Sequence, residues 1–179
     1  KGVLEAPEGA AVVTPLTTIM NKLMDEGIAS DSAQAQTMVK SALGITSAVD
    51  LTTFDPVAAA VSDDPSEATA GIEIAAKGVA IQNFVVQAAA VVKAAGDMGW
   101  GASTSDVYKS IASYMDGLSG AELMPDNNTE AQNISVLKGL VEGAAQVAGL
   151  ADADLAEVEA VSDAVATVMY ESNSLLESA

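Results

Sequence analysis

The sequence predicts an all-α protein, a bundle of about six helices around one long apolar helix, preceded by an extended N-terminal arm. Residues 65–96 carry apolar side chains around nearly the whole circumference of a helix, and such a helix must be surrounded by other helices or by lipid. Elsewhere, apolar residues recur at three- and four-residue spacing between helix-cap signals. Half of the residues are hydrophobic but only 3% are aromatic, which favours a core of closely spaced, alanine-rich helices.

The arm comprises residues 1–14, whose pattern differs from that of the remaining chain, 15–179. Its apolar residues lie in two short extended pieces, on either side of a turn at Pro7-Glu8-Gly9. A strand without a partner in its own chain has an open edge. We therefore expect the arm either to add a strand to a neighbouring subunit or domain or to pack on its own bundle. The candidate assembly residues are Val3, Leu4, Val12 and Val13.

The first two helices follow one design. Thr14 caps the first, Pro15 occupies its first helical position, and Gly27 ends it. The second is expected to be capped by Ser30 and to end at Gly44. The expected apolar faces are Leu16, Ile19, Met20 and Leu23 in the first helix and Met38, Val39, Ala42 and Leu43 in the second.

The later helices are placed by their caps and apolar spacing. Asp55 precedes a short helix that begins at a proline, Asp64 precedes the long one, and Ser103 and Thr129 resemble the first residues of capping boxes. Besides 65–96, the expected helices are residues 56–61, 103–117, 129–149 and 152–177. The expected apolar face of the last helix is Leu155, Val158, Val161, Val165, Val168 and Leu175.

Two pairs of residues within 65–96 suggest how the long helix is used. Gly71 and Gly78 lie seven apart on nearly the same face, and each costs about 1 kcal/mol relative to alanine. They indicate either a close approach of another helix or a groove for a small apolar ligand. Glu73 and Lys77 form an i,i+4 pair in the favourable order, which predicts an exposed edge. Lipid is the weaker interpretation because strongly polar residues interrupt every stretch of about 18 residues.

Composition excludes several classes of function. The formal net charge is −18, from 25 acidic residues against 7 basic ones, and all the basic residues are lysines. Nucleic acids and anionic membrane surfaces are therefore unsuitable partners, and no membrane insertion is expected. The chain has neither Cys nor His, so thiol and imidazole chemistry are excluded. Carboxylates and lysines remain, with no pair placed for acid–base work, and we expect a protein that is not an enzyme.

Metal and cofactor signals are weak. Asp126, Asn128 and Glu130 lie in an oxygen-rich loop, and Asp152 and Asp154 precede the last helix. These five residues are the candidate calcium ligands, but the loop lacks the alternating ligands and central glycine of an EF-hand. A polar turn with a helix cap and acidic residues at a helix N-terminus are the favoured explanation of these residues. No cofactor is expected, with calcium the one ion considered.

The stretch from Gly2 to Pro56 resembles helical modules of large bacterial surface proteins. The matching pieces are Leu4, APEGA at 6–10, VVTPLTT at 12–18, ALG at 42–44 and VDLTTFDP at 49–56, with a further likeness in FVVQ at 84–87. Such modules accompany cadherin-like, VCBS-type or calcium-binding repeats in adhesin-like proteins of marine bacteria and cyanobacteria. The resemblance covers about the first hundred residues. It implies an extracellular or cell-surface location and a structural or adhesive role, and it implies no catalytic residues.

The leading hypothesis is therefore a non-enzymatic module of a secreted bacterial surface or matrix protein. Its expected partners are other copies of itself or neighbouring β-sandwich modules, joined through the arm. A chain that begins at Lys1 without a methionine indicates a processed protein or an excised fragment. The alternative is a helical bundle that binds a small apolar ligand beside the glycines of the long helix.

Overall fold

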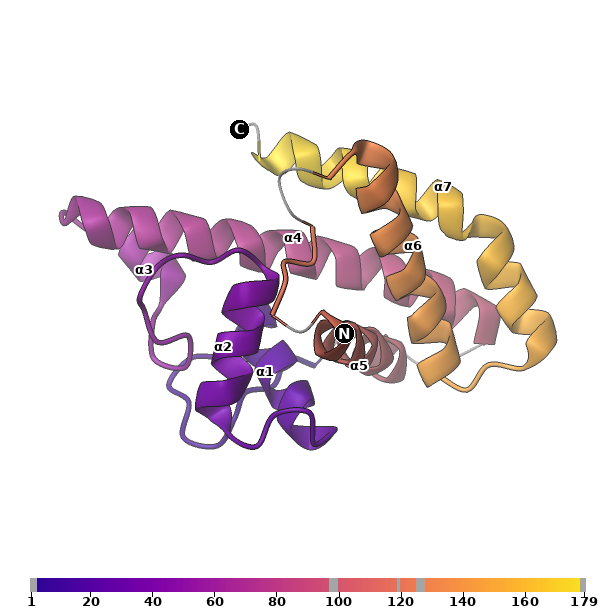
Figure 1. Ribbon diagram of the computed structural model, residues 1–179, viewed down its shortest axis with the longest axis horizontal. Helices are drawn as coiled ribbons and strands as arrows, with labels where there is room; N and C mark the ends of the chain where they lie inside the picture. Colours follow the sequence, from indigo (N-terminus) through magenta and orange to yellow (C-terminus); the bar gives the residue numbers. More distant parts are fainter. Residues whose placement is uncertain (1–2, 97–99, 119, 125–127, 178–179) are drawn as a thin grey trace.

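The computed structural model describes residues 3–96, 100–118, 120–124 and 128–177, and within them the chain forms seven helices and no strand (Figure 1). This confirms the all-α fold class. The helices are α1 (Pro15–Asp25), α2 (Ser32–Ala42), α3 (Pro56–Ala60), α4 (Pro65–Gly96), α5 (Trp100–Gly117), α6 (Glu130–Val147) and α7 (Asp152–Glu177).

Helix α4 is the central element of the bundle. It crosses most of the width of the molecule in Figure 1 and packs against α1, α3, α5, α6 and α7. One face of α4 is buried between residues 70 and 92, and it carries Ala70, Ile74, Ile81, Phe84, Val85, Ala88, Ala89 and Val92. Small residues on this face let the neighbouring helices approach closely, so the core forms with few aromatic side chains.

The predicted N-terminal caps are present at four helices. The Thr14 hydroxyl accepts a hydrogen bond from the Thr17 amide, and the Thr17 hydroxyl accepts one from the Thr14 amide. The same reciprocal box joins Thr129 to the residue three positions later at the start of α6. The carboxylates of Asp55 and Asp64 accept hydrogen bonds from the first amides of α3 and α4. Caps of this kind contribute about 1 kcal/mol each.

Glycine ends α1 and α2 as the sequence predicts. Gly27 and Gly44 adopt positive φ, +70° and +62°, a conformation that costs glycine little. In each case the following isoleucine closes a six-residue turn: the Ile28 amide donates to the Leu23 carbonyl at 2.9 Å, and that of Ile45 donates to a carbonyl five residues earlier at 2.9 Å. These turns complete Schellman motifs that fix where the chain leaves each helix.

Two predicted helix starts were wrong. Helix α2 is capped by Asp31 rather than Ser30, because the Asp31 carboxylate accepts from the Gln34 amide, and the Gln34 side chain accepts from the Ser30 amide. Helix α5 begins at Trp100, so Ser103 lies inside the helix and is fully buried. A serine in the first turns of a helix gives the same local signal as a serine cap, and only tertiary packing separates the two.

The predicted apolar face of α7 was right at Val158, which is buried, and at Leu155 and Val165, which pack against the core, but it was wrong at Val161 and Val168. Val161 and Val168 are exposed, whereas Ser162, Ala166 and Met169 are buried. The Ser162 hydroxyl donates to the carboxylate of Glu142 on α6 at 2.7 Å, which satisfies it inside the interface. Valines occur on both sides of this helix, so apolar spacing alone does not identify the packed side.

Candidate functional site

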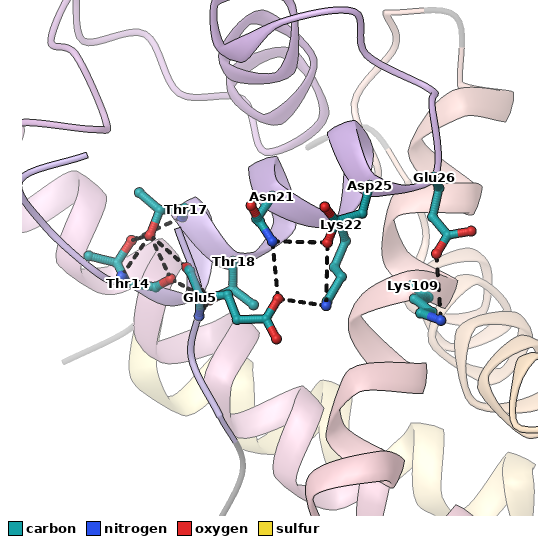
Figure 2. A network of polar contacts seen from close by, with 9 residues as sticks. All are labelled: Glu5, Thr14, Thr17, Thr18, Asn21, Lys22, Asp25, Glu26 and Lys109. Atoms are coloured by element: carbon teal, nitrogen blue, oxygen red, sulfur yellow. Dashed lines mark hydrogen bonds and ion pairs between the residues drawn. The ribbon is translucent and has the colours of Figure 1, made fainter. Parts of the chain in front are cut away.

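The N-terminal arm is bound to helix α1 by Glu5 (Figure 2). The Glu5 amide donates to the Thr18 hydroxyl at 3.0 Å, and its carbonyl accepts from that hydroxyl at 3.0 Å. The Glu5 carboxylate lies 2.6 Å from the ammonium of Lys22, whose side chain is almost fully buried, and also accepts from Asn21 at 3.1 Å. Asp25 completes the cluster at 3.7 Å from the Lys22 ammonium. Backbone and side chain together therefore fix this part of the arm.

The second half of the arm is held by the α2–α3 connection. The amides of Ala11 and Val12 both donate to the Thr52 carbonyl, at 2.8 and 3.2 Å. Of the candidate assembly residues, Val3, Leu4 and Val13 are exposed and Val12 is half-buried. These backbone contacts favour the second alternative for the arm, packing on its own bundle, because a strand added to a partner needs free amides and carbonyls.

A second surface feature is an apolar stripe along α4 that the other described helices leave largely uncovered, with α7 reaching it only at Asn83. It consists of Ile72, Ala76, Val79, Asn83, Val86 and Ala90, and we call it the outer stripe. Ile72, Val79 and Val86 are 60%, 52% and 46% exposed. Its single polar residue is satisfied within the chain, since the Asn83 amide donates to Ser172 and Asn173 of α7 at 3.0 Å each. The stripe carries no charge, and it corrects the expectation that other helices would surround α4.

By length and composition, α4 is also a helix that is able to cross a membrane, although a core helix of a soluble protein passes the same test. A third of its most apolar eighteen-residue window is buried inside the bundle. Much of the remaining, incompletely buried part of this window belongs to the outer stripe.

A cavity of about 440 Å³ lies on the opposite side of α4, among five helices and the α5–α6 connection. Its apolar part is built from buried side chains of α4, α5 and α6, chiefly Ile81, Phe84, Ile111, Leu137 and Leu140. Its polar part consists of half-exposed side chains, which are Lys77, Asn128, Asn133, Tyr170, Asn173 and Ser174. A deep apolar base with a few polar groups at the opening is the usual form of a small-molecule site.

The charge of the cavity is opposite to that of the molecule. No Asp or Glu is among the described residues that line it, although acidic residues outnumber lysines 25 to 7 in the chain. Lys77 makes no hydrogen bond or ion pair within the described part of the structure. By contrast, partners are present for Lys22, Lys40, Lys93, Lys109 and Lys138.

The predicted Glu73–Lys77 pair is not formed, and this explains why Lys77 faces the cavity alone. Glu73 instead accepts hydrogen bonds from the Thr46 amide at 2.9 Å and from the Ser47 hydroxyl. Burial, the largest single effect, raises the pKa of the Glu73 carboxyl, but the hydrogen bonds from Ser47 and Thr46 together outweigh it and lower the pKa. The carboxylate thus binds the α2–α3 connection and does not neutralise the lysine one turn later.

The candidate calcium residues act as helix ends wherever the structure describes them. Asp126 lies outside the described residues. The Asn128 amide donates to Asn133 at 2.9 Å, Glu130 is in the first turn of α6, and Asp152 and Asp154 are in the first turn of α7. Within the described chain, no three acidic residues are grouped to hold a metal ion.

The predicted glycine groove does not coincide with the cavity. A Cβ on Gly71 would lie 2.3 Å from the Ala60 backbone nitrogen, so this glycine serves the close approach of α3 to α4. Gly78 has open space around its Cα and does not line the cavity. The sequence signal that was missed is the spacing of Lys77, Ile81 and Phe84, which places a lysine and two large apolar side chains on one face of a helix.

Comparison of the chain with protein-family models, with curated proteins and with solved structures found no match.

Proposed function

We propose that the protein is a non-catalytic, self-associating module of a bacterial surface or matrix protein, and that two copies join through the outer stripe of α4. The observation that carries the proposal is an uncharged, exposed apolar stripe along the central helix of a chain whose net charge is −18. A contiguous exposed apolar surface rimmed by polar residues is typical of an interaction site. Like-charge repulsion opposes contact between two copies at most other surfaces.

The spacing of the stripe fits a second helix of the same kind. Its residues follow one another at intervals of four and three, the seam of a coiled coil. The β-branched residues Ile72, Val79 and Val86 occupy one row, and Ala76, Asn83 and Ala90 occupy the other. Large and small residues therefore alternate along the seam.

An antiparallel pairing matches each large residue with a small one. With a two-fold axis at position 81, Ile72 lies opposite Ala90 of the second copy, Ala76 opposite Val86, and Val79 opposite Asn83. Every contact then occurs twice, as a two-fold symmetric interface requires. Alanines opposite valines allow a close approach of the two helices, and the interface contains no pair of like charges.

The surface location rests on composition and on the family resemblance. A strongly acidic chain without arginine or cysteine suits a salty or calcium-rich medium, where ions screen its self-repulsion. The pattern from residue 2 to residue 56 adds the likeness to adhesin-associated helical modules. In this proposal the arm completes the bundle, and α4 supplies the contact between copies.

Light scattering on the full chain tests the proposal. We expect a dimer, twice the 17.9 kDa of one chain, in calcium and in EDTA alike. Val79→Lys should shift the mass to the monomer because it buries an unpaired charge in the seam. Val168→Lys on α7 is the matched control, since the two valines are 52% and 55% exposed. Both variants reduce the net negative charge equally, so a loss of dimer in Val79→Lys alone is due to the seam.

Cross-linking tests the direction of pairing. The chain has no cysteine, so any disulfide that forms must join the introduced cysteines. A mixture of Ala76→Cys and Val86→Cys chains should form disulfide-linked dimers on mild oxidation. Val86→Cys alone should not form such dimers. In the antiparallel register the two introduced cysteines are offset by ten residues along the helix axis, which is about 15 Å and too far for a disulfide. Efficient linkage of Val86→Cys alone would show a parallel pair.

Three results would overturn the proposal. The first is an intact chain that stays monomeric at high concentration. The second is a monomer that floats with zwitterionic vesicles, which would assign the stripe to lipid. The third is a dimer that survives Val79→Lys but disappears when residues 1–13 are deleted, which would return the contact to the arm.

A further inference from the structure

We infer that the cavity beside α4 is a binding site for an unbranched aliphatic carboxylate of medium chain length, held with its head group at Lys77 and its chain against Phe84 and Leu140. The inference does not rest on the proposed self-association, because the cavity and the outer stripe lie on different faces of α4 and share no residue; one hydrogen bond, from Asn83 of the stripe to Asn173 of the cavity lining, connects them.

The negative charge of the ligand's head group follows from the residues at the opening of the cavity. Lys77 is the one charged residue among the described residues that line the cavity, and its ammonium has no partner in the described chain. A carboxylate at this point gains a charge-assisted hydrogen bond. A cationic head group would face the ammonium instead, and a purely apolar ligand would leave the ammonium unpaired.

Neighbouring groups complete a site for a carboxylate. The α7 residues Tyr170, Asn173 and Ser174 line the same cavity and supply hydroxyl and amide donors. Glu73, the acid one turn from Lys77, is held away by Thr46 and Ser47. The nearest competing anion on the helix is therefore already satisfied.

The apolar part sets the nature of the chain. Ile81, Phe84, Ile111, Leu137 and Leu140 are all buried and line the cavity. A volume of about 440 Å³ is in the lower part of the range for ligand sites, about 300–1,000 Å³. This size favours a chain of medium length over a long-chain fatty acid, which would extend into solvent.

Calorimetric titration of the full chain with octanoate, decanoate and dodecanoate tests the inference. We expect saturable binding that tightens about fourfold per methylene until the cavity is filled. Lys77→Gln should raise the dissociation constant of decanoate about tenfold. The dissociation constant of the uncharged analogue decan-1-ol should change by no more than about twofold. Lys93→Gln is the matched control, since it removes the same charge from the same helix outside the cavity.

A second variant tests the cavity independently of the charge. Ala80→Phe places a ring in the space that Ala80 lines and should abolish binding of decanoate and decan-1-ol together. Ala94→Phe, at an exposed position on α4, should leave both unchanged, and circular dichroism establishes that each variant is folded.

The outcomes separate cleanly. No saturable binding across the acid series would overturn the site. Equal effects of Lys77→Gln on decanoate and decan-1-ol would overturn the assignment of the head group. Binding that survives Ala80→Phe would place the ligand elsewhere, and binding that disappears in Val79→Lys, on the outer stripe, would contradict the independence of the two surfaces.

Discussion

Glu5 connects the arm to α1 through an ion pair with a lysine that is largely removed from solvent. The Lys22 side chain is only 8% exposed and lies 2.6 Å from the Glu5 carboxylate. Glu5→Gln should lower the free energy of unfolding by about 1–3 kcal/mol, because a charged hydrogen bond to a buried lysine is lost. Urea denaturation measures the change. Glu8 is an exposed acid of the same arm, so Glu8→Gln should lower the free energy of unfolding much less. Equal decreases in the two variants would show that the ion pair contributes little.

Glu73 makes stability depend on pH in a defined direction. Its pKa is lowered from the ordinary 4.5, because the hydrogen bonds from Ser47 and Thr46 outweigh the opposing effect of burial. The unfolded chain therefore takes up this proton at higher pH than the folded protein. The stabilisation from Glu73 is complete above the ordinary value and disappears as pH falls through the lowered one.

Comparison with Glu73→Gln measures this contribution. At neutral pH the unaltered protein should be the more stable of the two, and the difference should narrow once pH drops below about 4.5. Urea denaturation at a series of pH values gives the two curves. Ser47→Ala, which removes one donor and keeps the carboxylate, should show a weaker pH dependence, and parallel curves for all three proteins would contradict the assignment.

Two glycines of α4 should respond in opposite directions to the same substitution. Gly71→Ala places a methyl group 2.3 Å from the α3 backbone, so we expect a loss of about 1–3 kcal/mol through overpacking. A Cβ added at Gly78 would meet no neighbouring atom within 4 Å. Gly78→Ala should therefore raise the free energy of unfolding by about 1 kcal/mol through its higher helix propensity. Thermal unfolding followed by circular dichroism compares the pair. A gain in both variants would mean that α3 moves away at little cost.

Helix existence and helix ends were largely predictable because they depend on local chemistry. Thr14 with Pro15, Asp55 with Pro56, and Gly27 with Ile28 each specify a cap from a few neighbouring residues, and all three are observed. The predicted start of α2 was wrong by one residue because Ser30 and Asp31 are both favoured cap residues. That of α5 was wrong because a serine in the first turns of a helix resembles a serine cap. The choice depends on what the rest of the bundle buries.

The candidate site was predictable in part, since its chemistry depends on contacts distant in sequence. Glu73 and Lys77 have the spacing of an ion pair, but Thr46 and Ser47 bind the carboxylate from another segment. Besides α4, the cavity needs four further helices and the α5–α6 connection, and no local pattern shows where they meet. The outer stripe was visible as apolar circumference, but its exposure follows only from the arrangement of the other helices.

The charge of the whole molecule should make its stability depend on salt. With a net charge of −18, self-repulsion destabilises the compact state, and the screening length falls from about 30 Å at 0.01 M salt to about 3 Å at 1 M. We expect the melting temperature to rise with sodium chloride, mostly below about 0.3 M. The few described ion pairs, at Lys22, Lys109 and Lys138, weaken over the same range, so a fall in melting temperature would show that they outweigh the repulsion.

The bonds at Glu5 also have a mechanical consequence for the surface module that we propose. Tension applied from the N-terminal side loads the contacts of Glu5 with Thr18 and Lys22 before it reaches the helical core. When these contacts and those of Ala11 and Val12 with the Thr52 carbonyl break, residues 3–13 straighten toward a total length of about 35–40 Å while the core stays intact, so the arm lengthens before the bundle unfolds. Single-molecule pulling should show this short step before the main unfolding event. In Glu5→Gln the step should occur at lower force, and a single-step trace in both proteins would contradict this role.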